Sequence, residues 1–366
     1  MISKLIAVYV KMDSLIFFVI LVISFKACKA INTTPKTTPK FPAVFIFGDS
    51  TVDSGNNNYF ETLGRANHKP YGQDFPGHVP TGRFSNGKLV SDFLASMLGI
   101  KETVPPFLDP SLSDHELQTG VCFASSGAGY DDITPEVTRV IPVMKQVELF
   151  KKYITRLKGI LGEEEAKKTI NGSLVIISAG TNDFAFNFYD APTRRLQFNV
   201  SQYQDFLQNR LQNFVKQLYD LGSRKMLIAG LVPIGCLPFQ ITLKFRNPLK
   251  RKCIENQNLD ARNYNEKLVN LLPQMQAKLP QSHIAYADVY ETLSDMINNP
   301  TKYGFEKTKN GCCGTGLIEF GPLCTPVTPT CEKVSNHLFW DAAHPTEPAY
   351  RHMAEILVKE AIPKLV

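Results

Sequence analysis

The sequence predicts an α/β fold in which a parallel sheet lies between layers of helices. Short apolar runs of strand length alternate with longer amphipathic runs, as in sheets whose parallel strands are joined by helices. Hydrophobic residues make up 43% and charged residues 20% of the 366 residues, which is ordinary for a protein with a substantial core. No internal repeat or linker divides residues 41–366, so we expect one domain there.

Residues 1–30 are typical of a secretory signal peptide. Lys4 and Lys11 precede an uncharged apolar run over residues 15–25, and small residues follow up to Ala30. A membrane anchor is the competing interpretation, but this run has about half of the roughly 20 apolar residues that a spanning helix needs. We therefore expect cleavage near Ala30, a secreted, extracellular protein, and no stable membrane anchor. The sequence leaves Met12 open as the start.

Residues 31–40 are rich in Thr, Pro and Lys, and we expect a flexible leader there because the segment is too polar to pack. Removal of residues 1–30 deletes four lysines and one aspartate, which lowers the formal net charge from +6 to +3. A mildly basic surface without Lys/Arg blocks and interleaved aromatic residues predicts no nucleic-acid partner.

The strands and helices follow from hydrophobic periodicity. We predict strands over residues 43–47, 174–178, 226–229 and 284–287. Helical periodicity covers residues 87–98, 202–221, 256–279 and 347–362, and the last of these helices begins just after Pro345.

The cysteines support export. Seven of the eight lie beyond the signal sequence, and six of those seven lie late in the chain. A zinc site is the alternative, but the adjacent Cys312 and Cys313 and the spacings that follow fit no C-x-x-C finger. We expect three disulfides, with Cys236 bonded to Cys253, the other four late cysteines paired among themselves, and Cys122 left as a buried thiol. Three N-x-S/T sequons make Asn32, Asn171 and Asn199 glycosylation candidates.

Ser50 is the candidate nucleophile. Gly48-Asp49-Ser50 follows the first predicted strand directly, and ligands of parallel sheets bind beyond the carboxyl ends of the strands. The same three residue types also suit an ordinary turn. The G-x-S-x-G elbow of α/β-hydrolases is absent around Ser50.

Asp341 and His344 are the candidate partners of Ser50. A serine hydroxyl needs a base to take its proton, and a carboxylate must hold the imidazole of that base in the right tautomer. Asp341-Ala-Ala-His344 supplies both groups on one loop before the last helix. Taken alone, such a pattern is more often a helix-entry turn.

Acyl transfer also needs donors for the oxyanion. The small residues of GVCFASSGAG, residues 120–129, allow close approach of backbone N–H groups to a substrate, and Asn182 in SAGTNDF offers a side-chain amide. The alternatives are a tight packing loop for the first segment and an Asx turn for the second.

Together and in this order, the four segments resemble the signature blocks of the SGNH hydrolase superfamily, in particular its plant GDSL esterase/lipase branch. The resemblance spans residues 41–365 and includes FGDSTVDSGNNN, TGRFSNGK, ISAGTND, LVPIGCLP, GCCGTG and FWDAAHPTE. It implies a flavodoxin-like three-layer α/β/α sandwich with a central parallel sheet. Thr51 stands where the motif name has Leu, a position that many plant members vary.

The resemblance also implies a role for each matching residue. Ser50 would be the nucleophile and one backbone oxyanion donor, with Gly127 as a second backbone donor and Asn182 as the side-chain donor. His344 would be the base and then the acid, and Asp341 its partner. Cys122 and Ser126 replace the Asn and Gly that are frequent in this branch, which bears on the assignment of Gly127.

We therefore expect a secreted serine esterase or lipase that hydrolyses carboxylic esters through an acyl-enzyme, with no metal and no organic cofactor. Lipid esters, acetylated polysaccharides and small acetylated metabolites all fit as substrates. Two alternatives stay open from sequence alone. One is an acyltransferase that uses the same residues, and the other is a non-catalytic secreted ligand-binding protein that keeps the fold.

Overall fold

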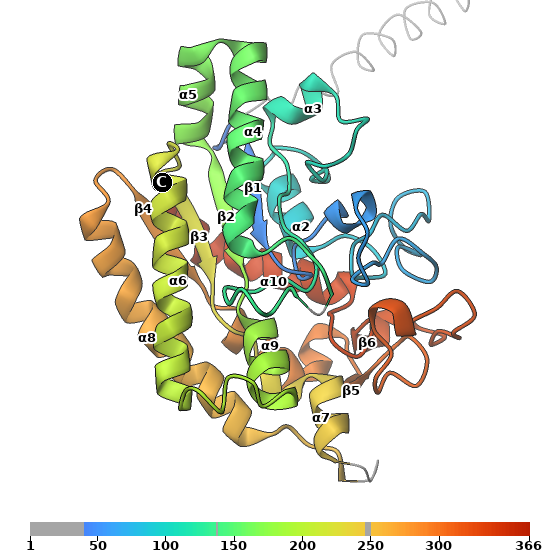
Figure 1. Ribbon diagram of the computed structural model, residues 1–366. Coiled ribbons are helices and arrows are strands. Elements are labelled where there is room, and N and C mark those ends of the chain that lie inside the picture. The colour runs from blue at the N-terminus through green and yellow to red at the C-terminus, as the bar shows by residue number, and fades with distance from the viewer. Residues whose placement is uncertain (1–39, 137, 246–249) are drawn as a thin grey trace, which may run out of the picture. The chain divides into compact units, whose positions relative to one another are not determined.

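The computed structural model describes residues 40–136, 138–245 and 250–366. Four parallel strands form the central sheet in the order β1-β2-β3-β4 (Figure 1). They are β1 (Val44–Gly48), β2 (Leu174–Ser178), β3 (Lys225–Ala229) and β4 (His283–Ala287). Phe45, Val175, Met226 and Ile284 stand in register across the sheet. The predicted parallel sheet and its four strands are confirmed, with bounds within one residue of those expected.

A further stretch of chain runs along the free side of β1. The N–H of Ile46 donates to the carbonyl of Val121, the N–H of Phe123 donates to the carbonyl of Ile46, and Ile46 forms a parallel bridge with Cys122. Strand β1 therefore has parallel neighbours on both sides, and the chain leaves it toward one of them before returning to the other. Such a reversal of strand order opens a crevice at the carboxyl end of the strand.

Helices cover both faces of the sheet, as the sandwich prediction requires (Figure 1). In the view of Figure 1, α4 (Val143–Leu161) and α6 (Val200–Asp220) lie in front of the sheet, and α10 (Glu347–Glu360) lies behind it. Helix α5 (Glu163–Gly172) packs against α4, α8 (Glu255–Lys278) against α6, and both α2 (Val90–Met97) and α9 (Val289–Asn298) against α10. The short helices are α3 (Asp114–Gln118) and α7 (Pro238–Lys244).

Helix boundaries follow capping chemistry. Helix α6 begins after Asn199, whose side chain accepts from the N–H of Gln202 while the Gln202 side chain accepts from the N–H of Asn199. Helix α2 begins at Val90, three residues later than predicted. The N–H of Leu89, just before this start, donates to the side chain of Asp92 at 2.9 Å.

The cysteine predictions are confirmed. Cys236 is bonded to Cys253, Cys312 to Cys331 and Cys313 to Cys324, and Cys122 is free and buried. Two of the disulfides close the segment that follows β5 (Lys307–Gly311) and leads to β6 (His337–Phe339). These two strands pair in a small parallel sheet. This cysteine-rich segment, residues 312–331, lies beside the proposed Asp341–His344 loop.

The expectations for the signal peptide, for residues 31–39 of the leader and for Asn32 fall outside the described residues. Within the part of the chain that the structure describes, no helix combines the length and the apolar character needed to cross a bilayer.

Candidate active site

Ser50 lies just past the carboxyl end of β1, in a turn that only glycine permits at position 48. Gly48 has φ +138°, and a Cβ there would lie 1.8 Å from the carbonyl oxygen of Ser178 on β2. The side chain of Gln146 on α4 holds this turn from the other side, because it accepts from the Gly48 N–H and donates to the Gly48 carbonyl, both at 2.8 Å. The position of Ser50 is therefore fixed by two neighbouring elements.

A hydrogen-bonded chain joins Ser50 to the two candidate partners. Nε2 of His344 lies 2.8 Å from Oγ of Ser50, and Nδ1 lies 2.8 Å from Oδ2 and 2.9 Å from Oδ1 of Asp341. Asp341 is fully buried, and Ser50 and His344 are 7% and 6% exposed. Ser50 and His344 are 294 positions apart in the sequence and meet because α10, which follows His344, packs beside α2 on the face behind β1.

The loop that carries His344 is closed by its own hydrogen bonds. The N–H groups of Ala343 and His344 donate to Oδ1 of Asp341 at 2.8 and 2.7 Å. The N–H of Trp340 donates to the carbonyl of His344 at 2.7 Å. The ring of Phe84 packs against the imidazole with 4.9 Å between the ring centroids. Asp341 and His344 therefore form one rigid unit, with the second imidazole nitrogen turned to Ser50.

The TGRFSNGK segment supports this unit from outside the hydrogen-bonded chain. Asn86 accepts from the N–H of Glu347, and the carboxylate of Glu347 accepts from the N–H of Lys88. Arg83 makes a buried bidentate ion pair with Asp92 at 2.8 Å, which ties the segment to α2. The segment thus has a structural explanation, since it locks the start of α10 in place.

A cavity of about 740 Å³ opens at Ser50 and His344. Most of its wall is apolar, and the described residues that form it come from loops after β1, β2 and β3, from α9 and α10, and from the cysteine-rich segment. The apolar side chains include Leu63, Val90, Ile133, Phe186, Val232, Leu237, Phe239, Val289, Leu293, Phe320, Leu323 and Met353. A site of this volume and lining suits an organic ligand with a substantial apolar part.

The three candidate oxyanion donors all line this cavity. Among the described residues, none accepts a hydrogen bond from the backbone N–H of Ser50 or of Gly127. Gly127 has φ +87°, a conformation that suits glycine. The side-chain amide of Asn182 donates one hydrogen to the carbonyl of Ala128 at 2.9 Å, which leaves the second hydrogen for a ligand.

Asp49 places a second carboxyl group beside Ser50. Its Oδ1 accepts from the N–H of Thr51 at 3.0 Å and from the Thr51 hydroxyl at 2.7 Å, and that hydroxyl lies 2.9 Å from the hydroxyl of Ser178. Burial raises the pKa of Asp49 to about 6, against the opposing effects of the Thr51 hydrogen bonds and of nearby His344.

Sequence analysis assigned no role to two groups of buried polar residues, one around Asp53 and one around Asp183. Both groups connect segments that are distant in the sequence. Asp53 accepts from the N–H groups of Gly55, Asn56 and Ser126. Asn56 donates to the carbonyls of Cys122 and Ala124. The signal in the sequence was the run of three asparagines at residues 56–58, which is too polar for a buried segment unless each amide has partners.

Asp183 does the same for the segment after β2. It is fully buried and accepts from the N–H groups of Tyr130 and Asp131 and from the Thr134 hydroxyl. Burial raises its pKa to about 7. Because Asp183 follows Asn182 directly, these contacts also fix the backbone that carries the candidate side-chain donor.

The two glycosylation candidates within the described residues lie at the surface of helices. Asn199 is exposed at the start of α6, and Asn171 is half-buried in the last turn of α5.

Comparison with known proteins agrees with this geometry. Residues 44–357 match the family described as GDSL-like Lipase/Acylhydrolase. Two GDSL esterase/lipases of Arabidopsis thaliana are each 54% identical to this chain. One is aligned over 333 residues, 90% of this chain and 92% of the relative, and the other over 330 residues, 90% and 91%. A third is 49% identical over 349 residues, 94% of this chain and 97% of the relative. The chain therefore belongs to the GDSL esterase/lipase family of carboxylic ester hydrolases.

Proposed function

We propose that the chain is a secreted serine esterase or lipase whose domain, residues 41–366, hydrolyses carboxylic esters. Ser50 is the nucleophile, His344 the base and then the acid, and Asp341 the partner of His344. The observation that carries the proposal is the hydrogen-bonded chain from Ser50 through His344 to the buried Asp341. Ser50 and His344 line the apolar cavity, where an ester can reach the Ser50 hydroxyl.

In the proposed acylation step, Oγ of Ser50 attacks the ester carbonyl while Nε2 of His344 takes the hydroxyl proton. Asp341 accepts a hydrogen bond from Nδ1 and stabilises the imidazolium that forms. The N–H groups of Ser50 and Gly127 and the amide of Asn182 donate to the oxyanion. His344 then returns the proton to the leaving alkoxide, and the alcohol departs.

In the proposed deacylation step, water replaces the alcohol. His344 takes a proton from the water as the water oxygen attacks the acyl carbonyl, and the same donors hold the second oxyanion. The intermediate collapses, the bond to Ser50 breaks, and the proton on His344 returns to Oγ. The products are the free acid and the unmodified enzyme.

Labelling with a fluorophosphonate probe tests the nucleophile. We expect one adduct, mapped by mass spectrometry to Ser50, and hydrolysis of a short-chain p-nitrophenyl ester that Ser50→Ala lowers by several orders of magnitude. Ser335→Ala is the matched control, because Ser335 is exposed and lies in a short turn before β6. An adduct on a different serine, or wild-type turnover by folded Ser50→Ala, would reject the assignment.

Secretion is proposed on separate grounds. The structure contains three disulfides, and such bonds persist in oxidising compartments. We therefore propose that residues 1–30 direct export and that Asn199, Asn171 and Asn32 receive glycans. Peptide mapping of protein collected from the culture medium tests both points. A retained N-terminus would contradict cleavage, and unmodified sequons in protein made by a glycosylating host would contradict the glycans.

A further inference from the structure

The hydroxyl of Tyr71 links the Asp341 carboxylate to the cysteine-rich segment. It donates to Oδ2 of Asp341 at 2.7 Å and accepts from the N–H of Gly321 at 2.7 Å. Tyr71 is 1% exposed and lies outside every signature segment. We infer that Tyr71 is a positioning residue for Asp341, and that the disulfide-closed segment 312–331 takes part in catalysis by holding Tyr71. The inference rests on the proposed roles of Ser50, His344 and Asp341.

Among residues 40–136, 138–245 and 250–366, Asp341 has no other side-chain donor from a distant part of the chain. Its Oδ1 accepts from the N–H groups of Ala343 and His344, two and three residues further along the same loop. Within the part of the chain that the structure describes, its Oδ2 contacts Nδ1 of His344 and the Tyr71 hydroxyl, which is 270 residues away in sequence. Loss of the Tyr71 hydroxyl would therefore leave Oδ2 held by the imidazole alone.

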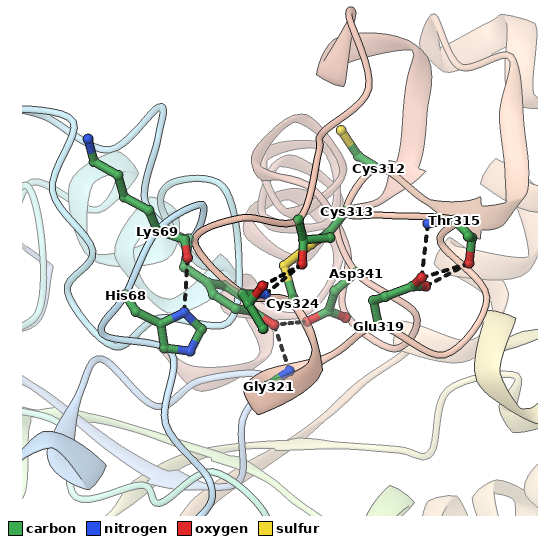
Figure 2. Close-up of a disulfide and its surroundings, with 12 residues drawn as sticks. His68, Lys69, Cys312, Cys313, Thr315, Glu319, Gly321, Cys324 and Asp341 are labelled. Atoms are coloured by element: carbon green, nitrogen blue, oxygen red, sulfur yellow. Dashed lines mark hydrogen bonds between the residues drawn. A yellow bond between two sulfur atoms is a disulfide. The ribbon is translucent and has the colours of Figure 1, made fainter.

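Tyr71 is itself held on two sides. Its ring packs in a small buried cluster with Phe84 and Trp340, and the cluster also contains Cys313 and Cys324. Its oxygen accepts from Gly321, three residues before Cys324. Figure 2 shows Gly321 and Asp341 close together beside the Cys313–Cys324 disulfide. The disulfide thus fixes the short turn that presents the Gly321 N–H.

The cysteine-rich segment also touches the loop directly. The carbonyl of Glu319 accepts from the N–H of Ala342 at 2.8 Å, and the Glu319 carboxylate accepts from the hydroxyl of Thr315, which braces the turn from within (Figure 2). Phe320 and Leu323 of the same segment form part of the cavity wall. One segment therefore lines part of the cavity, contacts the loop that carries His344, and holds Tyr71.

The hydroxyl has an electrostatic effect as well as a steric one. Burial, and then the charge of Asp341, raise the pKa of Tyr71 well above its usual value, so the hydroxyl keeps its proton and donates. A donor on Oδ2 disperses the negative charge that faces the imidazole. Without this donor, the carboxylate would stabilise the protonated imidazole more strongly, and a higher pH would be needed to free the base.

Tyr71→Phe tests the inference, because it removes the hydroxyl and keeps the ring. We expect kcat to fall about 10- to 100-fold, as for loss of one hydrogen bond to a charged group. We expect KM to change little and the acid limb of kcat/KM to move to higher pH. Tyr153→Phe is the matched control, since its buried hydroxyl donates to the carbonyl of Leu117, away from the cavity.

Two kinetic outcomes would overturn the inference. One is a wild-type kcat and pH profile in Tyr71→Phe. The other is a lower kcat with an unmoved pH profile, which would reveal a purely structural role. Wild-type protein is labelled with the fluorophosphonate in parallel. If the wild type does not react at Ser50, the proposed function fails, whereas equal reaction rates of wild type and Tyr71→Phe reject only the inference.

Removal of the disulfide provides a second route should Tyr71→Phe not fold. The double variant Cys313→Ser/Cys324→Ser keeps Tyr71 and frees the turn that holds it. We expect the acid limb of kcat/KM to move in the same direction as in Tyr71→Phe. The control is Cys236→Ser/Cys253→Ser, which removes a disulfide of another segment. Equal profiles of the two double variants would reject a role for segment 312–331.

Discussion

Of the three candidate oxyanion donors, the amide of Asn182 can be tested most directly, because a substitution removes a side chain and cannot remove a backbone N–H. One of its hydrogens is bonded to the carbonyl of Ala128. That bond fixes the rotation of the amide, so the second hydrogen has a defined direction. A donor that is oriented before the reaction stabilises a developing charge without further reorganisation.

Asn182→Ala should lower kcat by about 10²- to 10³-fold, the usual effect of losing one oxyanion donor, while KM changes little. Steady-state kinetics with a p-nitrophenyl ester measure both constants. Thermal unfolding of the variant serves as the control, since the Ala128 carbonyl also loses its partner. An unchanged kcat in a folded variant would remove Asn182 from the proposed oxyanion hole.

At the level of helices and strands, much of the sheet was readable from the sequence. Each strand of the central sheet is a short, mostly apolar run. The helix that starts at Val200 has a capping box, and the helix that starts at Glu347 has a proline in its first turn. The predicted elements do not include α4, although its buried positions recur every three or four residues. Here the periodic signal was present, and Lys and Glu on the exposed face made the segment look polar.

The contacts between elements could not be predicted from the sequence. Gln146 on α4 clamps Gly48, and Tyr71 in a loop reaches Asp341. A single glutamine in a helix and a single tyrosine in a loop form no sequence pattern, because their roles depend on which distant residues they contact in the fold. The residues expected to form the site could be located by motif, whereas the residues that support them became visible only with the fold.

Across the whole molecule, three buried aspartates hold the loops at the carboxyl edge of the sheet. They are Asp49 and Asp53, which follow β1, and Asp183, which follows β2. Their hydrogen-bond partners lie after β1 and in residues 126–134, before α4. Burial raises the pKa of Asp49 and of Asp53 to about 6 and that of Asp183 to about 7. The folded state is therefore more stable when these carboxyl groups are neutral than when they are charged.

The raised pKa values predict how stability depends on pH. An unfolded aspartate titrates near 3.9, so between about pH 4 and 7 the folded chain binds more protons at these three positions than the unfolded chain does. Stability rises with pH only where the unfolded state binds more protons. The contribution of these groups is therefore fully present below about pH 4 and is lost as the pH rises through 6 and 7.

Asp49→Asn isolates one of these contributions, because an asparagine oxygen can still accept from Thr51 and carries no charge at any pH. A pKa raised from 3.8 to about 6 corresponds to about 3 kcal/mol. Relative to the variant, wild-type protein should lose up to about 3 kcal/mol of unfolding free energy between pH 4 and pH 8. Urea unfolding at both pH values measures this difference. A gap between the two proteins that stays constant with pH would show that the Asp49 carboxyl titrates alike in the folded and unfolded chains.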